Sequence, residues 1–251
     1  MISRFIPVSF DISTYNLMPV HNKKIMETGL NIYHWRLFLV MLCCCLIFVA
    51  RSVQSASPEE ALTREDIERL KRGEILTETI HNEKSGGAAR VIALFHAAPE
   101  EVWDTIGYCE NEFVYVRGLE LCEVLIPGLQ FIRKHHRVNN NWYTPTIDFV
   151  FEASRSSPTH GDFKLVEGNL RVLEGQWDFQ LLAGSEAIIV THDIRVRSRF
   201  PAPRWLVRRV LKGDLPDMLA CIRGMSNGSG EESLRSADLA LCPGDPSKAR
   251  K

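Results

Sequence analysis

The sequence predicts an α+β fold in which a curved antiparallel sheet is covered on one face by a long C-terminal helix. Residues 119–199 form successive strand-like runs joined by turns too short for crossover connections, so neighbouring strands must pair antiparallel. Several runs alternate apolar and charged side chains, which is typical of a sheet with one buried and one solvated face. Residues 203–225 repeat apolar side chains at helical spacing and supply the cover.

Composition excludes several classes of protein. The 251-residue chain is 45% hydrophobic and 24% charged, with a net charge of −1. These values are ordinary for a globular protein and exclude a wholly disordered chain, a fibrous repeat and a polytopic membrane protein. The near-neutral charge argues against a strongly basic nucleic-acid binder, so no nucleic-acid partner is expected.

Residues 1–56 are interpreted as a signal peptide or an N-terminal membrane anchor. Residues 37–50 are uncharged and predominantly apolar, and they lie between Arg36 and Arg51. This run is shorter than the about 20 residues that a spanning helix needs, and it fits the 7–15 residues of a secretory signal. We therefore expect export to the periplasm or the extracellular space after cleavage. The alternative is a protein anchored to the membrane by residues 32–50.

The rest of the chain is divided into a lead-in helical segment at 57–74, a central domain at 75–226 and a tail at 227–251. The leader holds five of the 30 basic and two of the 31 acidic residues, so the remainder carries a net charge of −4. The tail is rich in Gly, Ser and charged residues, which predicts disorder.

Four cysteines follow the leader, at Cys109, Cys122, Cys221 and Cys242. One or two disulfides can form among them in an oxidising compartment. Cys221 falls at an apolar helical position and Cys242 falls in the tail, so we expect buried or free thiols rather than a disulfide framework. No spacing resembles a zinc site, and no metal or cofactor is expected.

The elements are expected in a definite order along the chain. Ser57 and Thr63 each begin a helix-start signal with acidic residues in the first turn, and Gly73 ends the segment. The apolar period then changes to two, which predicts one long bent strand or a hairpin over residues 75–96. Two short helices and six strands are expected after it, at 98–106, 108–114, 119–126, 130–138, 142–155, 161–166, 169–182 and 186–199.

The last helix carries one apolar face and one interruption. The face is formed by Val207, Leu211, Met218, Ile222 and Met225. Gly213 and Pro216 interrupt the helix, because Pro216 cannot donate a hydrogen bond to the carbonyl four residues before it. We expect a bend there, or a restart capped by Asp214.

This order of elements resembles the helix-grip fold of the START-like (SRPBCC) superfamily, including its polyketide cyclase/dehydrase-like and coenzyme Q-binding proteins. Ala97–Trp103, with the sequence AAPEEVW, is similar to the start of the family's first helix. Leu173–Trp177, with the sequence LEGQW, is similar to one of its strands, and Leu206–Gly224 to its closing helix. The resemblance covers about residues 63–226 and indicates a fold that hosts several functions.

The resemblance implies an apolar cavity between the sheet and the last helix, and therefore a lipid or another hydrophobic small molecule, such as an isoprenoid quinone, as partner. The alternative is that the same side chains only form a core. The oligomeric state has no signature in the sequence. The candidate cavity residues are Trp103, Phe149, Phe151, Trp177, Phe179, His192, Val207, Leu211, Met218 and Ile222.

His192 is the one candidate for an acid or base, because it lies on the apolar face of its predicted strand. A polyketide cyclase- or hydrolase-like enzyme using His192 is therefore the alternative to a non-catalytic binder. The sequence has no HExxH pair, no Gly-rich phosphate loop and no GxSxG elbow. These absences favour the binder.

A basic cluster with an embedded aromatic residue precedes the middle of the last helix. Arg204, Trp205, Arg208 and Arg209 are candidates for contact with a membrane surface or an anionic lipid headgroup. The alternatives are a solvated face that pairs with acidic residues, or a membrane-tethered interaction domain without a ligand.

Overall fold

The computed structural model describes residues 62–83, 86–139, 145–202, 204–245 and 247. The expected leader at 1–56, and with it the choice between signal peptide and anchor, lies outside the described residues. The same holds for the first helix-start signal, at Ser57. The description below concerns the unit that contains the described residues.

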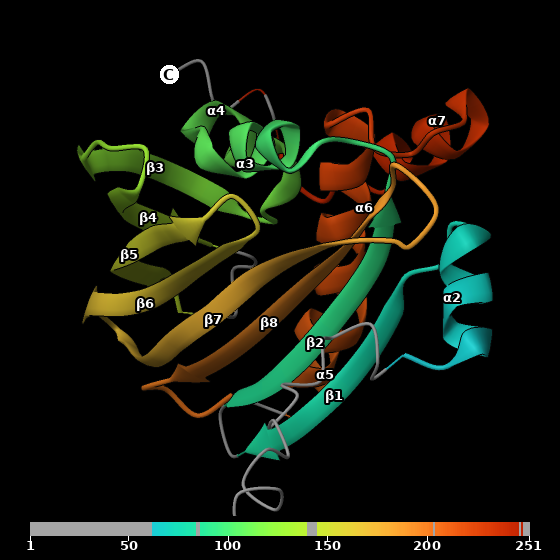
Figure 1. The fold of residues 1–251 in the computed structure, drawn as a ribbon. Coiled ribbons are helices and arrows are strands. Elements are labelled where there is room, and N and C mark those ends of the chain that lie inside the picture. The colour runs from blue at the N-terminus through green and yellow to red at the C-terminus, as the bar shows by residue number, and fades with distance from the viewer. Residues whose placement is uncertain (1–61, 84–85, 140–144, 203, 246, 248–251) are drawn as a thin grey trace, which may run out of the picture. The chain divides into compact units, whose positions relative to one another are not determined.

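Eight described strands form a single antiparallel sheet in the order β1-β2-β8-β7-β6-β5-β4-β3, which curls around the last helix (Figure 1). This architecture is the expected α+β helix-grip fold. Residues 75–96 form a hairpin rather than one bent strand. The strands are β1 (Leu76–Glu83), β2 (Gly86–Phe95), β3 (Leu119–Ile126), β4 (Phe131–Val138), β5 (Ile147–Ser157), β6 (His160–Gly168), β7 (Leu170–Leu181) and β8 (Ile188–Ser198).

The register of the sheet follows the side-chain alternation. Trp177 on β7 lies opposite His192 on β8, and Phe179 lies opposite Val190. Because partners in register share a face, these side chains all point toward the last helix. The inner face of the sheet is therefore apolar, as the alternation predicts.

Two short helices, α3 (Pro99–Gly107) and α4 (Cys109–Tyr115), connect β2 to β3 close to their expected positions. Pro99 occupies the first turn of α3, where its missing N–H costs no intrahelical bond. Both helices contact the last helix, so they close one end of the layer between it and the sheet.

The last helix is a continuous helical run of three parts: α5 (Arg204–Arg209), the π-helical turn η2 (Val210–Asp214) and α6 (Leu215–Met225). Pro216 has no N–H to donate, and the N–H of Leu215 reaches back five residues to the oxygen of Val210. The interruption is thus a π-turn at the expected place. Asp214 forms no side-chain cap hydrogen bond, contrary to expectation, because its carboxylate accepts a hydrogen bond from Arg117 at 2.9 Å.

Helix α2 (Arg64–Lys71) lies on the opposite face of the sheet (Figure 1). Thr63 and Asp66 form the expected capping box at its start. Leu70 is buried against Ile92 and Ile189, whose side chains point away from the last helix. The outer face of the sheet therefore carries a small second core where α2 covers it. The rest of the outer face carries the charged side chains.

The prediction of a disordered tail after residue 226 is wrong, because Glu232–Ala240 forms helix α7 against α6. Arg223 of α6 makes a two-pronged ion pair with Asp238, with both contacts at 2.8 Å. Ser229 donates a further hydrogen bond to Asp238 at 2.7 Å. A tail of polar composition is thus ordered by a buried ion pair, which compensates for its small apolar surface.

Among the described helices, none combines the length and the apolar content that a membrane crossing requires.

Candidate ligand site on the inner face of the sheet

The candidate cavity residues divide between two apolar clusters on the inner face. The first lies between the sheet and the last helix, and it includes seven of the candidates: Trp103, Trp177, Phe179, Val207, Leu211, Met218 and Ile222. The second lies over β5, β6 and β7 and contains Phe149 and Phe151 together with Leu170 and Leu173. The structure therefore does not bring Phe149 and Phe151 into the cluster under the helix.

The two clusters differ in burial where they approach each other. Under α6, Val91, Val190 and Ile222 are fully buried, at 0% exposure. Ile194 packs against both clusters and remains half-buried. Five of the large apolar side chains that pack against one or both clusters and keep some accessible surface are here called the half-buried band: Phe151, Phe163, Trp177, Ile194 and Met218.

Trp103 anchors α3 to the inner face near the band. Its ring lies 4.7 Å from that of Phe179, and its Nε1–H donates to the oxygen of Pro158 at 2.7 Å. The Arg155 guanidinium lies 5.3 Å from the ring centroid, within cation–π range. A Cβ atom on Gly161 would come within 2.6 Å of the Trp103 ring, so only glycine leaves room for this indole.

The LEGQW stretch has a structural explanation in Gly175. A Cβ atom there would lie 2.5 Å from the Phe163 ring and 2.1 Å from the main-chain oxygen of Asp193. Neither approach is tolerable, because real Cβ contacts are essentially never shorter than 3.0 Å. Gly175 therefore leaves room for the Phe163 ring against β7, and the motif shapes the wall of the band.

His192 is sealed in the core rather than open to a cavity. Its side chain lies parallel to Trp177 at 3.8 Å, and Nδ1–H donates to the main-chain oxygen of Gln176 at 3.2 Å. Burial lowers the pKa of His192 to about 4, so the ring is neutral at pH 7. With 3% exposure, the imidazole is closed off from solvent, so a substrate would reach it only if the surrounding side chains moved.

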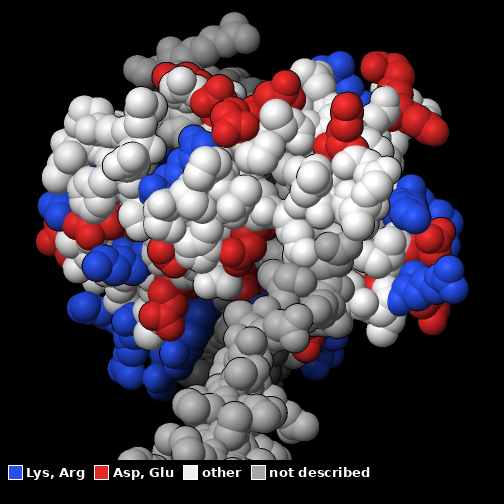
Figure 2. All heavy atoms as spheres, viewed as in Figure 1, with Lys and Arg blue, Asp and Glu red and all other residues white. Residues whose placement is uncertain are grey.

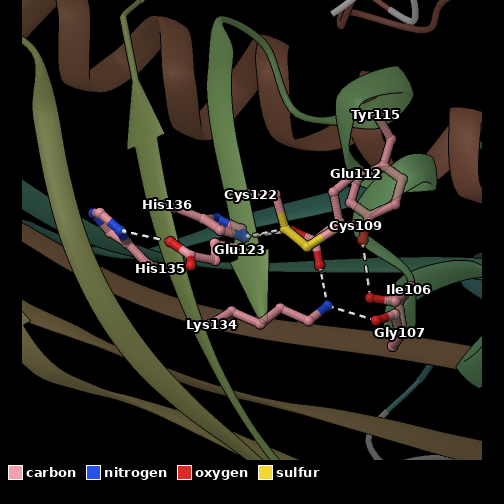
Figure 3. The surroundings of a disulfide bond; sticks show 10 residues. All are labelled: Ile106, Gly107, Cys109, Glu112, Tyr115, Cys122, Glu123, Lys134, His135 and His136. Atoms are coloured by element: carbon pink, nitrogen blue, oxygen red, sulfur yellow. Dashed lines mark hydrogen bonds and ion pairs between the residues drawn. A yellow bond between two sulfur atoms is a disulfide. The ribbon is translucent and has the colours of Figure 1, made fainter. Parts of the chain in front are cut away.

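A buried polar cluster that the sequence analysis missed lies at the end of the inner face (Figure 3). Lys134 of β4 forms an ion pair with Glu112 of α4 and donates to the oxygen of Gly107 at 2.6 Å. His136 Nε2 lies 2.6 Å from the other Glu112 oxygen. Burial by itself would raise the pKa of Glu112, but the charges and hydrogen bonds of His136 and Lys134 outweigh burial and hold it below its ordinary value.

Two disulfides replace the expected thiols, joining Cys109 to Cys122 and Cys221 to Cys242. The first connects α4 to β3 beside the polar cluster (Figure 3), and the second ties the end of α7 to α6. The expectation failed because Cys242 was assigned to a loose tail, whereas α7 brings it back to α6. An even number of cysteines after a predicted secretory leader was the signal that favoured pairing.

A small pocket of about 190 Å³ opens beside the π-turn and is lined by Thr79, Arg208, Leu211 and Lys212. The candidate headgroup residues Arg208 and Arg209 are exposed, as is Trp205 at 54%. The side chain of Arg204 lies outside the described residues. The structure thus places two basic side chains next to Leu211, one of the candidate cavity residues.

Charges on the outer face of the sheet pair across strands, as the alternation predicts. Arg90 forms a two-pronged ion pair with Asp193, and Arg195 pairs with Glu174. In Figure 2, acidic and basic groups are interspersed over much of the visible face, while Lys and Arg gather at the lower left near the end of β8. These pairs account for several of the charges on the predicted solvated face.

Comparison with protein families identifies the chain. The profile of the family described as "Polyketide cyclase / dehydrase and lipid transport" matches residues 95–223, about half of the chain. The protein belongs to this family. A search of curated proteins found no match.

Solved structures with a similar chain course include lipid transfer proteins and a cyclase. A STAR-related lipid transfer protein from Xanthomonas axonopodis is 12% identical, with a TM-score of 0.49 over 61% of this chain and 92% of that one. The human StarD13 lipid transfer and protein localization domain is 15% identical, with a TM-score of 0.46 over 64% and 93%. The Zhui aromatase/cyclase from Streptomyces sp. R1128 is 13% identical, with a TM-score of 0.39 over 66% and 94%.

Proposed function

We propose that the protein binds a lipid or another hydrophobic small molecule between its sheet and its last helix, for transport or sequestration and without catalysis. The observation that carries the proposal is the half-buried band. A sealed core buries its large apolar side chains completely, as the region under α6 does. Aromatic and aliphatic side chains that keep accessible surface on an inner face are the walls that an apolar ligand requires.

The pocket beside the π-turn supports a polar end for this ligand. Arg208 and Lys212 present two cationic groups next to Leu211, where an anionic or strongly polar headgroup would be attracted. Because π-turns weaken the regular hydrogen-bond ladder of a helix, η2 is a suitable place for the last helix to move when a ligand enters. The proposed ligand is therefore amphipathic, with its apolar part along the sheet.

Export is the proposed location. The two disulfides support it, because disulfides persist in oxidising compartments and are rare in the cytosol. The predicted signal peptide in residues 1–56 also supports export. Anchoring to the membrane by residues 32–50 is the alternative. N-terminal sequencing of protein isolated from cells distinguishes the two forms.

The family name includes cyclases, so a catalytic role needs a separate test. The buried position of His192 supports non-catalytic binding over the cyclase-like alternative, which uses this residue as its acid or base. His192→Phe is expected to bind ligand as the unchanged protein does. A large loss of a measured cyclase or hydrolase activity in this variant would restore the enzyme hypothesis.

Ligand binding is tested by filling the band. Met218→Trp adds an indole ring from α6, and we expect it to weaken uptake of a fluorescent fatty acid or quinone analogue by about tenfold or more. The matched control is Leu129→Trp, which adds the same ring at a 96% exposed position. Equal affinities in the two variants, with both folded by circular dichroism, would contradict a ligand site at the band.

A further inference from the structure

Four side chains with metal-binding atoms converge at the buried polar cluster: Cys109, Glu112, Cys122 and His136 (Figure 3). Cys122 Sγ lies 3.3 Å from His136 Nε2 and 3.7 Å from Glu112 Oε2. His136 Nε2 and Glu112 Oε2 are 2.6 Å apart. The donor atoms of Glu112, Cys122 and His136 all lie within 4.8 Å of one another, and Cys109 Sγ is covalently bonded to Cys122 Sγ.

The fold brings these residues together without relying on the disulfide. Cys109 and Glu112 are three residues apart on α4 and therefore share a face of that helix. Cys122 on β3 and His136 on β4 are direct partners in the antiparallel register. The helix and the strand pair are in contact, so the convergence remains when the sulfur–sulfur bond is broken.

The spacing of the donor atoms suits a tetrahedral zinc ion. With Zn–S near 2.3 Å and Zn–N or Zn–O near 2.0–2.1 Å, neighbouring ligand atoms lie about 3.3–3.8 Å apart. The two sulfur contacts of Cys122 already have this separation. The other two pairs of donor atoms must move apart: the two sulfurs when their bond breaks, and His136 Nε2 and Glu112 Oε2, which are 2.6 Å apart, when a metal enters between them.

The charge of the site balances in both redox states. In the disulfide form, the Glu112 carboxylate faces the Lys134 ammonium, and both side chains are at most 5% exposed. In a reduced form, two thiolates add two negative charges and Zn²⁺ adds two positive ones. Lys134 stays paired with Oε1 of Glu112 while Oε2 turns to the metal, so the two thiolates and Zn²⁺ together add no net charge to the buried cluster.

We propose that Cys109, Glu112, Cys122 and His136 form a redox-gated zinc site, which is closed by the disulfide and opens when the disulfide is reduced. A dithiol reductant transfers two electrons and two protons to the sulfurs and is itself oxidised to a disulfide. Zn²⁺ then displaces the two thiol protons to solvent and binds both thiolates, neutral His136 and the Glu112 carboxylate. The metal replaces the lost cross-link between α4 and β3. This proposal does not depend on the proposed ligand function.

The site is tested with Co²⁺ as a spectroscopic probe. In the full chain, Cys43, Cys44, Cys45, Cys221 and Cys242 are each replaced by Ser, so that Cys109 and Cys122 are the only cysteines left. After reduction with a phosphine under anaerobic conditions, we expect one equivalent of Co²⁺ to bind, with thiolate charge-transfer bands and the strong visible bands of tetrahedral cobalt. Zn²⁺ should abolish these bands, and the oxidised protein should show none.

His135 provides a matched control, because it is adjacent on β4 and points away from the cluster toward Glu123 (Figure 3), and its Nε2 lies 2.8 Å from Asp148 Oδ1. His136→Gln should weaken Co²⁺ binding by more than the 10–100-fold that loss of an outer-shell partner costs, and His135→Gln by no more than about twofold. If His136→Gln does not fold, His136→Cys keeps a ligand and should still bind, with additional thiolate absorption.

Three results would overturn the proposal. The first is a reduced, folded protein that binds no stoichiometric Co²⁺. The second is a His135→Gln variant in which binding is weakened as much as in His136→Gln. The third is a folded His136→Cys variant that shows no tetrahedral cobalt bands.

Discussion

The two ends of the inner face differ in the kind of side chain that they bury. Under α6, fully buried aliphatic side chains such as Val190 and Leu219 form a dry core whose stability comes from packing. Beside α4, Glu112, Lys134 and His136 are buried as a charged cluster next to a disulfide. The first end depends on close packing of apolar side chains, whereas the second is stable only because its charges are paired.

This comparison distinguishes the part of the inner face that only stabilises the fold from the part that also contains reactive side chains. The dry end holds the last helix on the sheet, and the charged end holds reactive groups that a purely structural core does not need. We place the ligand at the half-buried band, four of whose five side chains lie on β5–β8. Predictions that break one end while leaving the other intact test the comparison, and they are given from the largest expected effect to the smallest.

Removing one charge from the cluster should cost the most. Glu112→Ala leaves the Lys134 ammonium buried without its carboxylate, and we expect the free energy of unfolding to fall by about 3–5 kcal/mol. The double variant Glu112→Leu with Lys134→Leu should recover most of this loss, because no charge remains unpaired. Urea unfolding of the oxidised proteins measures both values. Equal losses in the single and double variants would contradict the charge argument.

A cavity in the dry end should cost slightly less. Leu219 on α6 is 0% exposed, so Leu219→Ala is expected to lower the free energy of unfolding by about 3 kcal/mol. The charged cluster should be unaffected, which a double-mutant cycle with Glu112→Ala would show as additivity within about 0.5 kcal/mol. A large coupling energy would mean that the two ends are not independent.

His192 should make the dry end sensitive to acid. Its folded pKa of about 4 lies below the usual unfolded value near 6.5, so the unfolded state takes up a proton first as the pH falls. The stabilisation is complete above about pH 6.5 and is lost between that pH and about pH 4, amounting to about 3 kcal/mol. His192→Phe should lack this loss while keeping the stacking on Trp177. Denaturant midpoints at pH 7 and pH 4.5 provide the measurement. An equal drop in both proteins would assign the acid sensitivity to other groups.

The half-buried band should be the least costly place to remove apolar atoms. Met218 neighbours Leu219 in the sequence but keeps accessible surface, so Met218→Ala is expected to lower the free energy of unfolding by only about 1 kcal/mol. A loss as large as that of Leu219→Ala would show that the band is an ordinary part of the core.

Sequence reasoning was sufficient for the periodic parts of the molecule. The alternation around Trp177 and His192 predicted that both lie on the inner face. Gly213 and Pro216 predicted an interruption of the last helix, and the structure has a π-turn at Val210–Asp214, directly before Pro216. These features are local, because the spacing of apolar residues and the missing N–H of proline can be read from a short stretch of consecutive residues.

The features that sequence reasoning missed all depend on contacts between distant segments. Lys134 meets Glu112 over 22 positions, and Arg223 meets Asp238 over 15. A lysine on a strand or an aspartate in a polar tail carries no local mark of burial. Only the docking of α4 on β4, and of α7 on α6, makes these residues partners.

Native mass spectrometry of the full chain, purified from cells without delipidation, tests the central claim most directly. The account predicts an additional mass that organic solvent extracts as a lipid or another apolar molecule, that is retained in Leu129→Trp and that is lost in Met218→Trp. A mass equal to the bare polypeptide, together with no uptake of a fluorescent fatty acid or quinone analogue, would contradict it.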